Sequence, residues 1–253
     1  MAEAINRRVF AALQMVDAAT GQMIFSPIQL QGEGANIFRN KSGFFVIKEL
    51  HGASEYSASF ETPAAPPVGS MELTLSCQDP KRKYLERTLS LSLPRDANPA
   101  NSDNADSLFN PLVVELYRDV HAKTLVNWSL VRVVATDSGE PVVGAFIQVV
   151  RLSDDQLIGR SISNQQGEAL VIIPGIPITE FSEGDDEEDE DDSEEEEAVV
   201  IQDINVRVEL SLADPPQWPV NPDVLQSNHA ANIEQTINTS LRTGRTEIVR
   251  FAL

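Results

Sequence analysis

The feature that most constrains the fold is a run of short apolar segments between residues 128 and 178. Four such segments are separated by clusters of Asp, Asn, Ser and Gly, which favour turns. These clusters are Asp137-Ser138-Gly139, Ser153-Asp154-Asp155 and Asn164-Gln165-Gln166-Gly167. Short apolar runs between turn signals are typical of consecutive antiparallel strands. The sequence therefore predicts a module of antiparallel strands between these residues.

A second copy of this plan lies near the N-terminus. Residues 16–21 (VDAATG) correspond to residues 135–139 (ATDSG). Residues 39–47 (RNKSGFFVI) correspond in the same way to residues 163–172 (SNQQGEALVI). Internal repetition of this kind predicts that one β-module occurs twice in the chain.

The first apolar segment, Val9 to Val16, follows Arg7 and Arg8 and could be the apolar core of a signal peptide. It is short for that role and contains Gln14, and the repeat makes it the first strand of the first module. No apolar run reaches the roughly 18 residues that a membrane-spanning helix needs. We expect a soluble cytoplasmic protein that does not insert into membranes.

Alternation of apolar and polar residues continues between the two copies, at residues 56–60, 71–76 and 88–93. Strands with one apolar and one polar face pack as sandwiches. We expect a first β-sandwich domain at residues 1–94, a linker or long loop at 95–111, and a second β-sandwich domain at 112–253. The apolar segment at 112–117 fits either domain and is counted with the second.

Acidic residues are concentrated in one run. The net charge is -20, and 13 of the 39 acidic residues lie between Glu183 and Glu197, so the remaining 26 acids against 19 bases give -7. This balance argues against binding to nucleic acid or anionic membranes, which are themselves negative. Apolar strand patterns flank the run on both sides, so residues 182–197 are expected to be a disordered insertion between two strands.

Three roles are open for the acidic insertion. It could bind Ca²⁺ through Asp185, Asp186, Asp189, Asp191 and Asp192, although the run lacks the ligand spacing of a fixed calcium loop. It could dock onto a basic surface of a partner, or act only as a solvated spacer. Apart from this calcium candidate, the sequence predicts no cofactor.

In the C-terminal segment, the spacing of apolar residues changes from the alternation of strands to a helical spacing. Asn221-Pro222-Asp223 has the residues of a helix start. Apolar residues then recur at spacings of three to five, at Val224, Leu225, Ala230, Ile233, Ile237 and Leu241, and Gly244 follows. This spacing predicts a helix over residues 222–243. Residues 245–253 are predicted to form a closing strand.

No catalytic set is visible. Cys77 lies in an alternating run and is expected to be a buried thiol, and His51, His121 and His229 are isolated from one another and from any metal-binding motif. A hydrolase would need His51 or His121 to meet a carboxylate and a nucleophile in space. We expect no enzymatic activity.

The two tryptophans have different surroundings. Trp128 opens an apolar strand and is expected in the core. Trp218 lies in the proline-rich loop 214–219, where an aromatic side chain can anchor a partner or cover the predicted helix. Trp218 is therefore the candidate partner-binding residue.

The repeated turns resemble those of the carboxypeptidase-regulatory-like modules, which are small transthyretin-like or immunoglobulin-like β-sandwiches. The matching residues are Asp137, Gly139, Pro141, Gly144, Ala145, Gly167 and Pro174-Gly175 in the second copy, and Asp17, Thr20, Gly21 and Gly43 in the first. The first copy departs from the pattern because it lacks the Gly-Ala pair. Such modules are non-catalytic spacers and interaction platforms, and the resemblance implies no active site.

The whole layout is also similar to accessory proteins of phage-tail-like contractile injection machines. Together these resemblances imply a mainly β chain with two sandwich domains, one C-terminal helix and a closing strand. They imply a structural or assembly protein that binds other protein subunits, within a large particle and with oligomerisation allowed. The alternative is a calcium-dependent surface or adhesion module that uses the acidic insertion.

Overall fold

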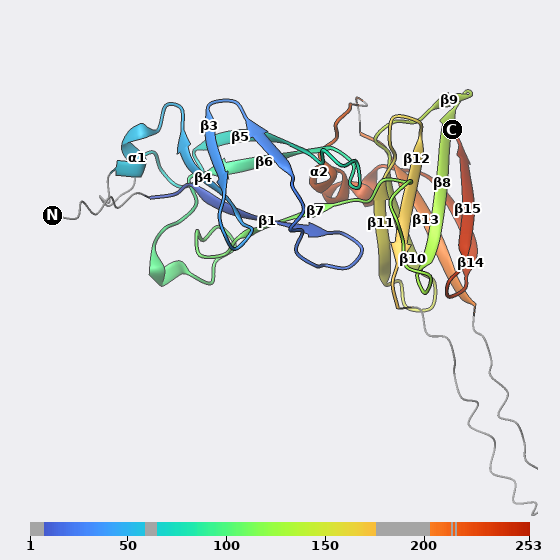
Figure 1. Ribbon diagram of the computed structural model, residues 1–253. Coiled ribbons are helices and arrows are strands. Elements are labelled where there is room, and N and C mark those ends of the chain that lie inside the picture. The colour runs from blue at the N-terminus through green and yellow to red at the C-terminus, as the bar shows by residue number, and fades with distance from the viewer. Residues whose placement is uncertain (1–7, 59–64, 176–202, 214, 216) are drawn as a thin grey trace, which may run out of the picture.

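The computed structural model describes residues 8–58, 65–175, 203–213, 215 and 217–253 (Figure 1). The fold is mainly β, with 48% strand and 8% helix, which confirms the predicted class. Four sheets form two face-to-face pairs, called here the first and the second sheet pair. Within the described residues, no helix has the length and apolar content needed to cross a membrane.

The first sheet pair packs the sheet β3-β4-β1-β7 against the sheet β2-β5-β6. Its strands are β1 (Ala11–Asp17), β2 (Gln29–Gly32), β3 (Ala35–Arg39), β4 (Phe45–Leu50), β5 (Met71–Gln78), β6 (Arg87–Leu93) and β7 (Leu112–Leu116). Two short helices accompany them, α1 (Ser54–Ala58) and the 3-10 turn η1 (Pro99–Asn101). Alternate residues of β5 and β6, such as Leu75 and Leu89, bury against Leu13 and Ile47 of the facing sheet. The alternation of apolar and polar residues in this part of the sequence therefore corresponds to strands whose apolar side chains face the core.

The second sheet pair packs β12-β8-β15 against β11-β10-β13-β14. Its strands are β8 (Ser129–Asp137), β9 (Glu140–Pro141), β10 (Phe146–Arg151), β11 (Leu157–Ile162), β12 (Glu168–Ile173), β13 (Ile204–Ser211), β14 (Ile233–Leu241) and β15 (Thr246–Ala252). Helix α2 (Pro222–Ser227) and the 3-10 turn η2 (His229–Ala231) precede β14. Val133, Val149, Val171 and Val208 meet in its core. The strands predicted between residues 128 and 178 are β8, β10, β11 and β12.

The two sheet pairs share one pairing scheme. Strand β1 pairs with β4 antiparallel and with β7 parallel, and β8 pairs in the same way with β12 and β15. The facing sheets contain β2-β5-β6 and β10-β13-β14 in equivalent order. The third strand differs, because β3 joins β4 whereas β11 joins β10. The repeated turns in the sequence thus accompany a repeated strand order.

Strand β7 belongs to the first sheet pair. The sequence pattern places residues from 112 onward in the second domain, but β7 forms a parallel ladder with β1, from Leu13↔Leu112 to Asp17↔Leu116. Residues 95–111 therefore connect two strands of the same sheet pair. The buried Arg95 holds this long loop through the carbonyl groups of Ala105, Ser107 and Asn110.

The predicted helix over residues 222–243 is wrong beyond its first turns. Asn221 does cap a helix, since its side chain accepts a hydrogen bond from the Asp223 amide, and Pro222 takes the first helical position. Helix α2 nevertheless ends at Ser227, and residues 233–241 form β14, paired with β13. Ile233, Ile237 and Leu241 are four residues apart, which suits one face of a helix and also one face of a strand. The closing strand is confirmed as β15, with β8 as its parallel partner.

The acidic run lies between the end of β12 at Ile173 and the start of β13 at Ile204. Its place between two strands agrees with the prediction. Residues 182–197 themselves, including Asp185, Asp186, Asp189, Asp191 and Asp192, lie outside the described residues.

The two sheet pairs meet through a small apolar cluster and, in the described residues, two ion pairs. The cluster contains Leu85, Tyr117, Phe146, Ile162, Val220 and Leu225. Arg87 of β6 is fully buried and forms an ion pair with Asp223 of α2, and Arg160 of β11 pairs with Glu115 of β7. The Thr88 amide donates to the Val220 carbonyl over 2.7 Å. We call this contact region the joint.

Candidate binding cleft

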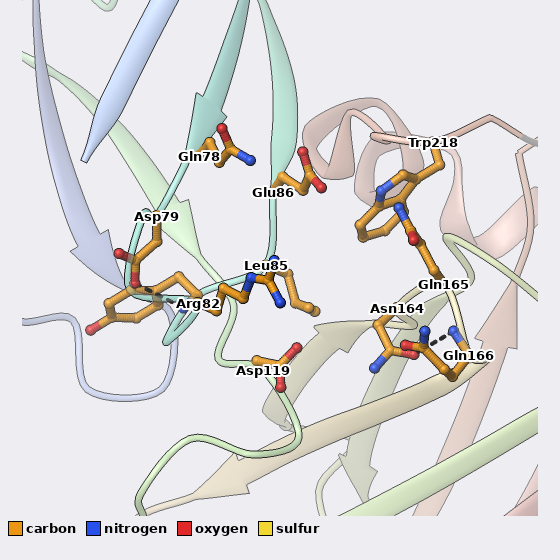
Figure 2. Close-up of a pocket in the computed structure, with 11 residues that line it drawn as sticks. Gln78, Asp79, Arg82, Leu85, Glu86, Asp119, Asn164, Gln165, Gln166 and Trp218 are labelled. Carbon is orange, nitrogen blue, oxygen red and sulfur yellow. Dashed lines mark hydrogen bonds between the residues drawn. The ribbon is translucent and has the colours of Figure 1, made fainter. Parts of the chain in front are cut away.

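A cleft of about 290 Å³ opens at the joint (Figure 2). Its walls come from four places in the sequence, namely the β5–β6 turn, the segment after β7, the β11–β12 turn and the loop before α2. The main lining residues are Gln78, Asp79, Arg82, Leu85, Glu86, Asp119, Asn164, Gln165, Gln166 and Trp218. Because both sheet pairs contribute, the cleft exists only when they are held together.

The β5–β6 turn forms one wall and is fixed by Asp79. The Asp79 carboxylate accepts hydrogen bonds from the amides of Lys81 at 2.9 Å, Lys83 at 2.9 Å and Tyr84 at 3.2 Å. Arg82 has a positive φ of 52° within this turn. Asp79 therefore has a structural role, and the Arg82 side chain extends along the cleft wall toward Leu85 (Figure 2).

The β11–β12 turn forms the opposite wall and is fixed by Asn164. The Asn164 side-chain oxygen accepts from the amides of Gln166 at 2.9 Å and Glu168 at 3.0 Å. Such an Asx turn is the structure that the Asn-x-x-Gly pattern predicts. It leaves the side chains of Gln165 and Gln166 exposed at the cleft.

Trp218 lies at one end of the cleft (Figure 2). Its ring is half-buried and packs against the joint cluster, so it both lines the cleft and covers apolar side chains. Its indole N–H is buried without an acceptor in the part of the chain that the structure describes. Partner binding by Trp218 remains a prediction.

The lining groups can form hydrogen bonds with a ligand. In the described residues, the side chains of Glu86, Arg82, Gln165 and Gln166 have no hydrogen-bond partner and can meet polar groups of a ligand. No serine, cysteine or histidine is among the residues that line this cleft, and the Tyr84 hydroxyl donates to Asp17 over 2.9 Å. The cleft thus offers hydrogen-bonding groups on both of its walls.

The other residues considered from the sequence are placed as follows. Cys77 is buried, and burial raises the pKa of its thiol to about 12, which agrees with a core role. Trp128 is buried, with the Arg118 guanidinium 4.7 Å from its ring centre.

His51 and His121 are exposed, and within the described residues neither imidazole contacts a carboxylate or hydroxyl through a hydrogen bond. In the same part of the chain, no group of three or more His, Cys, Asp or Glu side chains could hold a metal ion.

His229 forms a buried polar cluster that the sequence did not reveal. Its Nδ1 lies 2.7 Å from the Ser211 hydroxyl, and its Nε2 lies 2.9 Å from the Glu209 carboxylate. Arg207 donates to the same carboxylate over 2.5 Å. The order Ser-His-Glu is that of a hydrolytic triad, but Ser211 is 0% exposed and His229, the first residue of η2, is buried. The serine cannot meet a substrate, so this cluster is a structural network.

Glu209 is the ionised member of this network. Burial acts to raise its pKa, but hydrogen bonds from His229 and Arg207 outweigh burial and hold the pKa of Glu209 below its usual range. Only the alternation in β13, which puts Arg207, Glu209 and Ser211 on one face, could have indicated this cluster from sequence.

An apolar patch lies on the outer face of the sheet β3-β4-β1-β7. Phe38 is 45% exposed and sits opposite Val46, which in turn sits opposite Ala12. Val113 of β7 is 62% exposed and pairs with Gln14. Phe44 precedes the buried Phe45 and is half-buried, so alternation places it on the same face. We call Phe38, Phe44, Val46 and Val113 the outer patch.

No protein-family model matches this chain, and no significant match is found among curated proteins.

Proposed function

We propose that this chain is a non-catalytic structural protein that binds other protein subunits within a larger assembly. The observation that carries the proposal is the outer patch, where aromatic and aliphatic side chains remain exposed on a sheet face. Contiguous exposed apolar groups on a soluble protein mark interaction surfaces, because leaving them in water is unfavourable. The polar cleft at the joint offers a second contact region for the same partner.

The chemistry of the chain supports the same proposal. The histidine that contacts both a carboxylate and a hydroxyl, His229, is buried, and no serine, cysteine or histidine lines the cleft. The net charge of -20 favours a partner with a basic surface. In its narrower form, the proposal describes two immunoglobulin-like or transthyretin-like domains of the carboxypeptidase-regulatory-like kind. The assembly would then be a cytoplasmic phage-tail-like contractile injection particle, an assignment that rests on the sequence layout alone.

The test is co-purification of tagged protein from its native host with two matched variants. Phe38→Asp places a charge in the outer patch, and Ile248→Asp places one at a 51% exposed strand position of the second sheet pair. We expect Phe38→Asp to reduce the recovery of bound subunits by about tenfold. Ile248→Asp should recover as much as the wild type, and both variants should keep the wild-type melting temperature.

Two results would contradict the proposal. If the wild-type protein is recovered from native extract as a free monomer, no assembly partner exists. If Phe38→Asp retains every subunit that the wild type binds, the outer patch is not the contact surface.

A further inference from the structure

In the part of the chain that the structure describes, strand β14 is the outer strand of its sheet, on the side away from the first sheet pair. It is nine residues long and pairs on one side with β13, from Ile204↔Leu241 to Ser211↔Ile233. The opposite edge of the same sheet, β11, faces the first sheet pair through Arg160 and Glu115, so β14 faces away from it (Figure 1). Within the described part of the chain, residues 233–241 make no backbone hydrogen bond outside the ladder with β13. Every second residue of β14 therefore offers an unpaired N–H and C=O to another strand.

The equivalent edge of the first sheet pair is covered. Strand β6 takes the place of β14 in the shared scheme. Its Thr88 amide donates to the Val220 carbonyl over 2.7 Å, and its Arg87 pairs with Asp223. In the described residues, the chain therefore covers the edge strand β6 of the first sheet pair. It does not cover the equivalent edge strand β14 of the second.

β14 also has few of the features that commonly protect an edge strand. Edges are protected by proline, lysine, inward charges, bulges or short length. Residues 233–241 contain no proline, lysine or arginine, and the single irregularity of the ladder lies at its start, beside Glu234. By contrast, β15 carries Glu247 and Arg250, and β3 and β7 have five residues each.

We propose that two copies of the chain associate by antiparallel pairing of their β14 strands about a two-fold axis at Asn238. This register places Glu234 of each copy opposite Arg242 of the other, and these are the charged residues between positions 233 and 242. Arg242 binds Asp203 through Nε and Nη2, which leaves Nη1 available for the glutamate. On the exposed face, Thr236 of one copy lies opposite Ser240 of the other, and the two Asn238 side chains lie opposite each other. These residues are uncharged, so no like charges face each other across the new ladder.

The proposal concerns a different surface from the outer patch and does not depend on the proposed function. Each chain carries a net charge of -20, so two copies repel one another in dilute salt. Added salt screens that repulsion and leaves the backbone hydrogen bonds of the new ladder. Dimerisation should therefore become stronger as the salt concentration rises.

Cysteine cross-linking tests the register directly. The native thiol, Cys77, is buried with its pKa raised to about 12 and does not react, so Asn238→Cys introduces one reactive thiol per chain. In the proposed dimer this thiol faces its own copy at a separation that a disulfide can span. Oxidised glutathione would accept the two electrons as the two thiols lose their protons. Thr74→Cys, at an exposed position of the central strand β5, is the matched control.

We expect Asn238→Cys to form linked dimers at least about tenfold faster than Thr74→Cys. In sedimentation velocity, the wild type should show a dimer that increases with concentration and salt. Asn238→Lys should abolish that dimer because two ammonium groups would face each other, and Thr74→Lys should not. The proposal is overturned if the wild type stays monomeric up to about 1 mM. It is equally overturned if the two cysteine variants cross-link at the same rate, or if the dimer survives Asn238→Lys.

Discussion

At the scale of single residues, the buried cluster around His229 shows how a polar network is tolerated inside a β-sandwich. Glu209 accepts hydrogen bonds from both His229 and Arg207, so its charge is compensated on two sides. Removing one partner from a buried charged network costs more than the network contributes in its intact form. The cluster therefore joins η2 to β13 and fixes the chain where α2 leads into β14.

Replacing Glu209 by Gln should lower the free energy of unfolding at pH 7 by about 1–3 kcal/mol. The pKa of Glu209 is depressed in the folded state, so its stabilisation is present above the pKa of an unfolded glutamate, about 4.3. It is lost as the pH falls through the lower folded-state pKa. Urea unfolding at pH 7 and at pH 3 measures both effects.

The exposed Glu140→Gln is the control and should leave stability unchanged at both pH values. A difference between wild type and Glu209→Gln that stays constant from pH 7 to pH 3 would show that the carboxylate of Glu209 is not the stabilising form.

At the scale of elements, two turns with the same backbone requirement differ in their surroundings. Gly139 and Gly167 have φ values of +91° and +72°, which other residues adopt only with strain. A methyl group at Gly139 would meet open space, whereas one at Gly167 would collide with the carbonyl oxygen of Ala135. The second turn is therefore fixed by packing as well as by its dihedral angles.

Gly139→Ala should cost about 1–2 kcal/mol, the strain of a left-handed backbone alone. Gly167→Ala should cost roughly twice that or more, because the β11–β12 turn must move away from β8. Chemical denaturation of both variants measures the comparison. Equal losses would mean that the turn can move away from Ala135 without cost.

At the scale of the whole molecule, the joint makes the two sheet pairs depend on each other. Arg87 is fully buried and donates to the Glu115 carbonyl over 2.8 Å as well as pairing with Asp223. Arg118 links Asp17 of β1 to the ring of Trp128, beside β8. Because the buried Arg87 and the other contacts of the joint connect the two sheet pairs, we expect wild-type protein to unfold in a single transition.

Arg87→Leu should separate that transition into two in differential scanning calorimetry. The variant leaves the Glu115 carbonyl without its donor and removes the partner of Asp223 at the contact. Arg151→Leu removes an exposed ion pair with Asp154 and should keep one transition, with a change below about 1 kcal/mol. A single transition in both variants would show that the joint does not couple the sheet pairs through Arg87.

Much of the strand content could be predicted from local pattern, and the remaining errors have identifiable causes. The alternation of Met71 to Gln78 and the Asx turn at Asn164 depend only on residues close in sequence, so both can be predicted from the sequence. The helix prediction is wrong for residues 233–241 because a spacing of four fits both helix and strand. The β-branched Ile233, Thr236, Ile237 and Thr239 are the residues that favour a strand there.

The sequence by itself determined the mainly β class, the repeated turns and the burial of Cys77, because each follows from backbone preference or alternation over a few residues. Only the tertiary structure decided that β7 pairs with β1, that His229 meets Ser211 and Glu209, and that two distant turns enclose a cleft. These features depend on contacts between segments far apart in the chain. Local pattern shows which face of a strand is apolar, and it carries no information about which strand will pair with its edge.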